Sequence, residues 1–214
     1  MIKLKALIVL NGNILDLNVL EKAGKESDFI LCADGGTDHC LKASLMPDMI
    51  IGDLDSISKD SLKVIYDNKI PIEKFPVKKD ATDSELSIDY LISKKFTDIT
   101  LVGAMGNRMD HTLSNILLLS KLHEKGIKGK IIDESNTIYM VDEELVLTKE
   151  EDSYVSVIPI TNLGAIITLK GFEYKLDKVK IKFGSTHGIS NRIIGDKAHI
   201  IVHEGACLVF VSKD

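Results

Sequence analysis

Short apolar runs alternate with stretches of helical periodicity along about the first 130 residues of the chain. The runs lack the polar alternation of a half-exposed strand, which indicates strands buried on both faces. Strands that alternate with helices predict βαβ units, and therefore an α/β fold with a mostly parallel sheet flanked by helices. The expected strands are Leu4–Leu10, Phe29–Ala33, Met49–Ile51, Pro71–Phe75 and Ile99–Val102, and the expected helices span about residues 16–24, 37–44, 59–68, 83–95 and 110–124.

A second pattern begins after about Gly126, where short β-type segments follow one another and no helical periodicity remains. Turn sequences such as TNLG and IIGDK separate the segments, and this spacing is typical of a β-sandwich or barrel. We therefore expect two domains, residues 1–130 and 131–214, the second an all-β sandwich. The expected strands after Gly126 are Lys130–Asp133, Thr137–Val141, Tyr154–Ile160, Ala165–Leu169, Lys180–Phe183, His199–His203 and Leu208–Val211.

Charge, hydropathy and cysteine content argue against several classes of protein. The formal net charge of -5 disfavours a nucleic-acid binder, which usually carries a basic surface. The sequence contains no run of about 18 apolar residues, so we expect no membrane span. The N-terminal apolar run ALIVL is too short for a signal peptide. The three cysteines, Cys32, Cys40 and Cys207, include no C-x-x-C pair. We therefore expect no disulfide framework and a cytoplasmic protein.

Polar and glycine-rich residues follow every predicted strand of the first domain. In a parallel sheet the carboxyl ends of the strands meet at one edge, where ligands bind. These residues, six aspartates among them, are therefore expected to converge. They are Asn11 after the first strand, Asp34, Gly35 and Gly36 after the second, Asp53 and Asp55 after the third, Asp80 and Asp83 after the fourth, and Arg108, Asp110 and His111 after the fifth.

Each of these features also has a purely structural interpretation, and taken singly the alternatives stay open. They are a turn at Asp34, loop acids at Asp53 and Asp55 before an N-cap at Ser58, a capping box at Thr82 and Glu85, a surface ion pair of Arg108 with Asp110, and a helix-start hydrogen bond at His111. For Thr82, Glu85 and His111 the structural interpretation is the preferred one.

Taken together, the acids favour a metal site. Two carboxylates about 4 Å apart repel by about 1 kcal/mol in water and by about 4 kcal/mol at an effective dielectric near 20. A divalent cation removes this conflict, and oxygen-only ligands suit Mg²⁺ that also binds substrate phosphates. The glycines allow backbone N–H groups to approach phosphate, and Lys78, Lys79 and Arg108 add positive charge.

Two familiar nucleotide motifs are absent from the sequence. There is no G-x-x-x-x-G-K-[ST] run, and GAMGNR has the wrong spacing for a dinucleotide fingerprint. A P-loop enzyme and a nicotinamide cofactor are therefore not expected. The residues alone predict an Mg²⁺-dependent enzyme that acts on nucleotide phosphates through positioning and charge neutralisation.

Five motifs occur in order along the chain: ADGG, PDMIIGDLDS, KKDATDSE, VGAMGNRMDHTLSN and STHGISN. With these motifs the chain resembles the thiamine pyrophosphokinase family from Asn11 to Asn191. The resemblance implies Mg²⁺-dependent transfer of a pyrophosphoryl group from ATP to thiamine, giving thiamine diphosphate and AMP. It also implies an ATP- and Mg²⁺-binding catalytic domain over residues 1–130, a thiamine-binding sandwich over 131–214, and a homodimer. In that dimer the active site lies where one subunit's catalytic domain meets the other subunit's β domain.

The resemblance also implies roles for individual residues. The metal ligands would be Asp34, Asp53, Asp55 and Asp83. The catalytic acids would be Asp83, Asp80 and Asp55, with Asp83 orienting or deprotonating the thiamine hydroxyl. ATP contacts would come from Asn11, Asp34, Gly35, Gly36, Lys79, Arg108 and Asp110, and thiamine contacts from Thr186, Ser190 and Asn191. Some relatives stack thiamine on a tryptophan, and this chain has none, so the aromatic partner is open.

Two other functions remain as alternatives to this interpretation. One is a kinase or pyrophosphokinase for another small alcohol, such as a pterin. The other is a non-catalytic regulator that binds a nucleotide or a metal.

Overall fold

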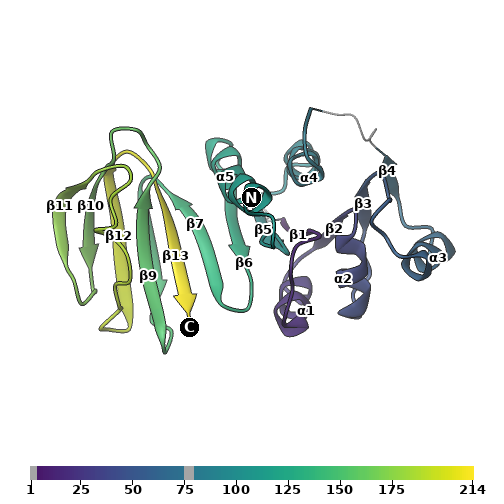
Figure 1. The fold of residues 1–214 in the computed structure, drawn as a ribbon, viewed down its shortest axis with the longest axis horizontal. Helices are drawn as coiled ribbons and strands as arrows, with labels where there is room; N and C mark the ends of the chain where they lie inside the picture. The colour runs from purple at the N-terminus through teal and green to yellow at the C-terminus, as the bar shows by residue number, and fades with distance from the viewer. Residues whose placement is uncertain (1–3, 75–79) are drawn as a thin grey trace. The chain divides into compact units, whose positions relative to one another are not determined.

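The computed structural model describes residues 4–74 and 80–214 and divides into two compact units, Met1–Glu134 and Ser135–Asp214 (Figure 1). Each unit has its own hydrophobic core. The predicted positions of Phe75, Lys78 and Lys79 lie outside the described residues.

The strands of the first unit pair in parallel in the order β4-β3-β2-β1-β5-β6. Their order changes direction at β1, because β2 lies on one side of it and β5 on the other. Such a topological switch point is where open parallel sheets bind ligands, beyond the carboxyl ends of the strands. The strands are β1 (Lys5–Val9), β2 (Phe29–Ala33), β3 (Met49–Gly52), β4 (Ile72–Lys74), β5 (Asp98–Val102) and β6 (Lys128–Ile132).

Helices cover both faces of this sheet, α1 to α3 on one face and α4 with α5 on the other (Figure 1). On the first face, Leu20 of α1 and Ile65 of α3 are fully buried in one cluster with Leu7 and Ile50 of the sheet. Burying one such side chain contributes about 1.5–3 kcal/mol, so the helices are fixed by packing against the strands. The helices are α1 (Leu17–Lys25), α2 (Gly36–Lys42), α3 (Lys59–Asp67), α4 (Asp83–Ser93) and α5 (Met109–Glu124).

The helix starts follow the sequence signals closely. Ser58 accepts a hydrogen bond from the backbone N–H of Ser61 at 3.2 Å, and Thr82 accepts one from Glu85 at 3.3 Å, so both act as the expected N-caps. The carboxylate of Glu85 binds the ammonium of Lys121 on α5 at 2.9 Å. Glu85 therefore ties α4 to α5 in addition to its place in the first turn of the helix.

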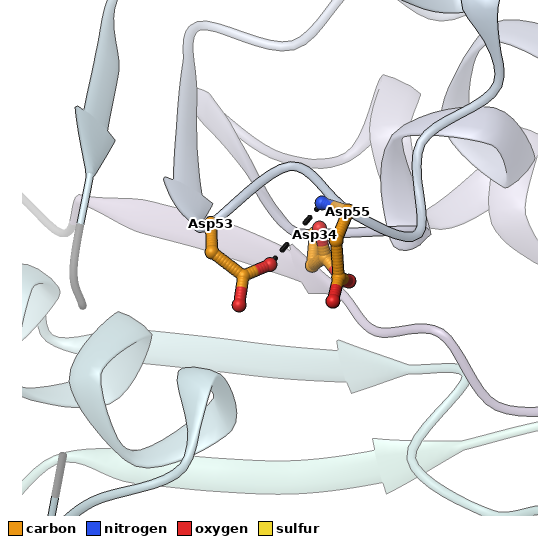
Figure 2. A group of neighbouring side chains, drawn as sticks. All are labelled: Asp34, Asp53 and Asp55. Carbon is orange, nitrogen blue, oxygen red and sulfur yellow. Dashed lines mark hydrogen bonds between the residues drawn. The ribbon is translucent and has the colours of Figure 1, made fainter. Parts of the chain in front are cut away.

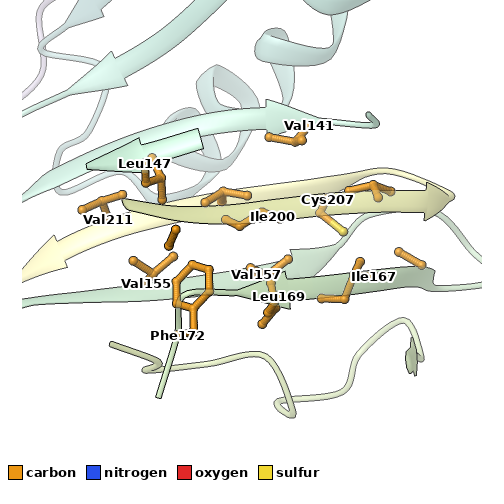
Figure 3. Packing of buried hydrophobic residues seen from close by; sticks show 14 of the residues in the cluster. Val141, Leu147, Val155, Val157, Ile167, Leu169, Phe172, Ile200, Cys207 and Val211 are labelled. Atoms are coloured by element: carbon orange, nitrogen blue, oxygen red, sulfur yellow. The ribbon is translucent and has the colours of Figure 1, made fainter. Parts of the chain in front are cut away.

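The second unit is an antiparallel β-sandwich, which confirms the expected fold class. One sheet has β13 between β7 and β9, and the other has the order β11-β10-β12-β8. Side chains from both sheets, such as Val155, Val157, Ile167 and Ile200, form the core (Figure 3). The strands are β7 (Asn136–Val141), β8 (Glu144–Thr148), β9 (Ser153–Pro159), β10 (Ala165–Lys170), β11 (Leu176–Ile181), β12 (Lys197–Glu204) and β13 (Cys207–Lys213).

The strands predicted after Gly126 differ from the structure in three places. The segment expected at Lys130–Asp133 is β6, which pairs in parallel with β5 of the first unit. Strand β8 was not expected, and β11 lies at Leu176–Ile181 rather than Lys180–Phe183. Both strands lie at an edge of their sheet, and each buries one side chain, Leu147 in β8 and Ile181 in β11. An edge strand with so little buried surface carries a weak apolar signal.

None of the described helices combines the length and apolar character that crossing a membrane requires.

Candidate active site

Three carboxylates gather at the carboxyl ends of neighbouring strands in the first unit (Figure 2). Asp34 follows β2, while Asp53 and Asp55 follow β3. One carboxylate oxygen from each residue lies within 4.8 Å of the other two. The convergence predicted from the strand ends is therefore realised for these three acids.

The backbone after β2 and β3 is bent so that these acids meet. Asp34 has a φ of 46°, and its N–H donates to the carbonyl of Ile51 at 2.9 Å. Gly52 has a φ of 147°, and a Cβ at this position would lie 3.0 Å from the Cβ of Asp34. A glycine is needed here because a side chain would be strained and would press against Asp34.

A local turn aims Asp53 and Asp55. The carboxylate of Asp53 accepts the backbone N–H of Asp55 at 3.1 Å (Figure 2), while Leu54 between them has a φ of 72°. The hydroxyl of Ser56 donates to Asp55 at 3.0 Å. These bonds fix both acids while leaving most of their lone pairs available to a ligand.

The electrostatics of the cluster are unfavourable without a cation. Burial raises the pKa of Asp34, the nearby charges of Asp53 and Asp55 raise it further, and a hydrogen bond from Ser56 opposes the rise. One carboxylate oxygen of Asp34 is buried and has no hydrogen-bond partner among the described residues. An unpaired buried carboxylate oxygen is costly, and a hard divalent cation with oxygen ligands satisfies it. The three acids therefore fit a divalent metal ion.

A cavity of about 750 Å³ lies beside the cluster at the switch point between β1 and β5. Its walls come from the loops after β1, β2 and β5 and from the first turns of α4 and α5. The predicted site residues that line it are Asn11, Asp34, Asp80, Asp83 and Arg108. Its size is in the range of small-molecule sites, and its glycine-rich loops allow a ligand to approach the backbone N–H groups, while its acids call for a cation beside any phosphorylated ligand.

Backbone contacts hold the loops of the cavity together. The N–H of Gly12 donates to the carbonyl of Gly103 at 2.8 Å, and the N–H of Asn13 donates to that of Met105 at 2.8 Å. A Cβ on Gly35 would lie 2.5 Å from the side chain of Asn11. The predicted ATP residues Asn11 and Gly35 are therefore in contact, and Gly36 begins α2 directly behind them.

The other predicted acids lie outside the cluster of three, in different surroundings. Asp80 and Asp83 line the cavity at the start of α4, whereas the compact group of described residues that could hold a metal consists of Asp34, Asp53 and Asp55 and does not include the predicted ligand Asp83. Asp110 forms an exposed salt bridge with Arg108 at 2.6 Å, as the structural alternative proposed. The hydrogen bond from Arg108 lowers the pKa of Asp110 to about 2. Lys79 lies outside the described residues.

The predicted thiamine residues belong to the second unit and differ from one another. Thr186 and Ser190 are exposed, while Asn191 is buried. The Asn191 side chain accepts from the N–H of Tyr174 at 3.0 Å and donates to the carbonyl of Tyr174 at 2.7 Å. Its oxygen also accepts from the N–H of Arg192 at 2.9 Å. Asn191 therefore holds two loops together and also lines a cavity of about 180 Å³.

Two family models match the chain. Residues 20–131 match "Thiamin pyrophosphokinase, catalytic domain", and residues 142–207 match "Thiamin pyrophosphokinase, vitamin B1 binding domain". A thiamine pyrophosphokinase of Bacillus subtilis is 34% identical over 183 residues, which cover 85% of this chain and 86% of that protein. The chain belongs to the thiamine pyrophosphokinase family.

Solved structures of family members agree with this assignment. A thiamine pyrophosphokinase from Bacillus subtilis superposes with a TM-score of 0.88 at 31% identity, covering 98% of this chain and 99% of that one. One from Geobacillus thermodenitrificans gives a TM-score of 0.85 at 28% identity, covering 99% and 98%. The chain therefore has the fold of the thiamine pyrophosphokinases, the family that the motifs resemble.

Two residues that line cavities of this family member had no binding role in the sequence predictions. His111 lines the large cavity of the first unit, although its expected role was a helix-start hydrogen bond. Tyr174, whose side chain is 65% exposed, lines the small cavity of the second unit beside Asn191. The sequence did contain a signal for Tyr174, because this aromatic residue follows closely after Gly171, which has a positive φ. An aromatic ring that is exposed near a turn is a common binding surface.

Proposed function

We propose that this protein transfers a pyrophosphoryl group from ATP to the hydroxyl of thiamine, yielding thiamine diphosphate and AMP. The observation that carries the proposal is the meeting of Asp34, Asp53 and Asp55 beside a cavity of about 750 Å³ within the part of the chain that matches the catalytic domain. Pyrophosphoryl transfer needs charge neutralisation and positioning more than covalent chemistry, and this site is built for both.

The three acids would hold Mg²⁺, which when bound neutralises charge on the phosphates of ATP. Asn11 and the N–H groups at the start of α2 would bind the phosphate chain from the glycine-rich side. Asp83 lines the cavity from the first turn of α4 and is proposed to orient the thiamine hydroxyl and accept its proton. Asp80 would support it from the same wall of the cavity.

The second unit would bind thiamine. Thr186, Ser190 and Asn191 are proposed as contacts, and the exposed ring of Tyr174 offers the flat surface that a tryptophan supplies in some relatives. We also propose that the protein is a homodimer in which each active site combines the first unit of one subunit with the second unit of the other. The buried, unpaired cysteines support a reducing compartment, the cytoplasm, as its location.

Product analysis tests this function directly. The protein is incubated with ATP, Mg²⁺ and thiamine, and the products are separated by chromatography. Thiamine diphosphate and AMP in equal amounts are expected. ADP with thiamine monophosphate would instead indicate simple phosphoryl transfer, turnover only with a pterin alcohol would indicate another substrate, and no product with either alcohol would indicate a regulator.

A further inference from the structure

Three of the other histidines, His39, His199 and His203, have defined imidazole contacts. The imidazole of His199 contacts Glu144 at 2.8 Å, that of His203 contacts Thr168 at 2.8 Å, and that of His39 hydrogen-bonds to the backbone of Gly12. Among residues 4–74 and 80–214, the imidazole of His111 has no comparable hydrogen bond, and the group that interacts with it electrostatically is the carboxylate of Asp110, which also accepts the backbone N–H of His111. The helix-start hydrogen bond expected from the sequence is therefore not what holds this side chain.

The backbone that carries His111 is firmly placed. One residue on, the buried hydroxyl of Thr112 accepts from the N–H of Gly106 at 3.1 Å, and the buried amide of Asn115 donates to the carbonyl of Ala104 at 2.8 Å. These bonds fix the first turns of α5 against the loop after β5. His111 is thus carried by a firmly placed first turn of α5 and lines the cavity.

The cavity has few groups that can attract an anion. Among its described lining residues, the basic side chains are those of Arg108 and His111. The guanidinium of Arg108 is already engaged by Asp110 through bonds of 2.6 and 3.2 Å. The carboxylate of Asp110 in the first turn of α5 accepts the backbone N–H of His111, and it is also paired with Arg108. Among the described basic side chains that line the cavity, His111 is therefore the one that is not held in a salt bridge.

We propose that His111 binds the phosphate chain of ATP as a hydrogen-bond donor. The proposal rests on the function proposed above and adds a substrate-contacting residue to it. The proposed role of His111 is to increase the affinity for the nucleotide. In this proposal it is neither the N-cap of α5 nor a contact to thiamine.

The test is an equilibrium binding measurement by calorimetry, with Mg²⁺ present and thiamine absent, using ATP, ADP and adenosine as probes. Loss of one hydrogen bond to a charged group predicts that His111→Ala weakens ATP binding about tenfold or more. Adenosine binding should stay unchanged, and His111→Gln, which keeps a donor, should retain most of the affinity for ATP. Ser114→Ala is the matched control, because Ser114 is exposed on the same helix and is not among the cavity-lining residues.

Steady-state kinetics separate this role from a structural one. His111→Ala should raise the KM for ATP and leave the KM for thiamine and the melting temperature unchanged. Unaltered ATP affinity, or an equal loss for adenosine and ATP, would overturn the phosphate contact even if the wild type makes thiamine diphosphate. A wild-type protein that binds no ATP would overturn the proposed function as well, and one that binds ATP in this way without forming product would overturn only that function.

Discussion

The two units hold their candidate site residues in opposite ways. In the first unit, Asp34 keeps a buried carboxylate oxygen without a hydrogen-bond partner among the described residues. In the second unit, the buried side chain of Asn191 makes hydrogen bonds to both backbone groups of Tyr174 and to the N–H of Arg192. The unpaired oxygen of Asp34 lowers stability but remains available to a ligand. The side chain of Asn191 uses its hydrogen bonds to stabilise the fold. Substitutions in the two units should therefore affect different properties.

The largest effect is expected from neutralising an acid of the metal cluster. Asp53→Asn keeps the shape of the side chain and removes a charged ligand, so turnover should fall by about 10³-fold, corresponding to several kcal/mol of charge stabilisation. The melting temperature should hardly change. The measurement is the rate of AMP formation, with Asp60→Asn as a control because Asp60 is an exposed acid of α3 outside the cluster. Full activity in Asp53→Asn would remove Asp53 from the site.

In the second unit, substitution of Asn191 should lower the stability of the protein. Asn191→Ala removes the buried side chain that binds both the N–H and the carbonyl of Tyr174, so the free energy of unfolding should fall by about 2–4 kcal/mol. Urea denaturation measures this loss. Thr186→Ala, at an exposed position in the same loop, should change the free energy of unfolding by less than about 0.5 kcal/mol. If Asn191→Ala is as stable as Thr186→Ala, the structural role of Asn191 is wrong.

A smaller effect is expected from the raised pKa of Asp34. A carboxyl whose pKa is raised on folding binds its proton more tightly in the folded state. Its contribution to stability therefore improves as pH falls from neutral toward the unfolded value near 4. In EDTA, Asp34→Asn should be more stable than the wild type at pH 7, and this advantage should shrink between pH 7 and about 4.

Urea denaturation of both proteins across this pH range measures the difference between them, which cancels the titration of the other groups. A difference that stays constant with pH would show that Asp34 titrates normally in the folded protein.

The sequence predicted the acid cluster because a general rule places it. Asp34, Asp53 and Asp55 follow strands of a parallel sheet, and the ends of such strands must meet. No comparable rule predicts where site residues lie in an antiparallel β-sandwich. The bonds of Asn191 depend on Tyr174, which lies 17 residues earlier in the chain, so no local pattern reveals them.

Side-chain direction was the other limit of prediction. Periodicity placed the start of α5 correctly, yet it could not show that His111 lines the cavity while Asp110 pairs with Arg108. Edge strand β8 was missed and β11 was placed too late in the chain, because each buries a single side chain. Sequence therefore indicates which strand ends form a site more readily than it indicates which side chains remain free there.

The central claim is that Asp34, Asp53 and Asp55 together hold a divalent cation, and a Mn²⁺ titration tests it most directly. In the absence of ATP, which itself chelates Mn²⁺, electron paramagnetic resonance reports free Mn²⁺ as the protein is added. Wild type and Asp60→Asn should remove Mn²⁺ from solution with equal affinity, and Asp53→Asn and Asp55→Asn should bind it far more weakly. Equal Mn²⁺ binding by all four proteins would contradict the account.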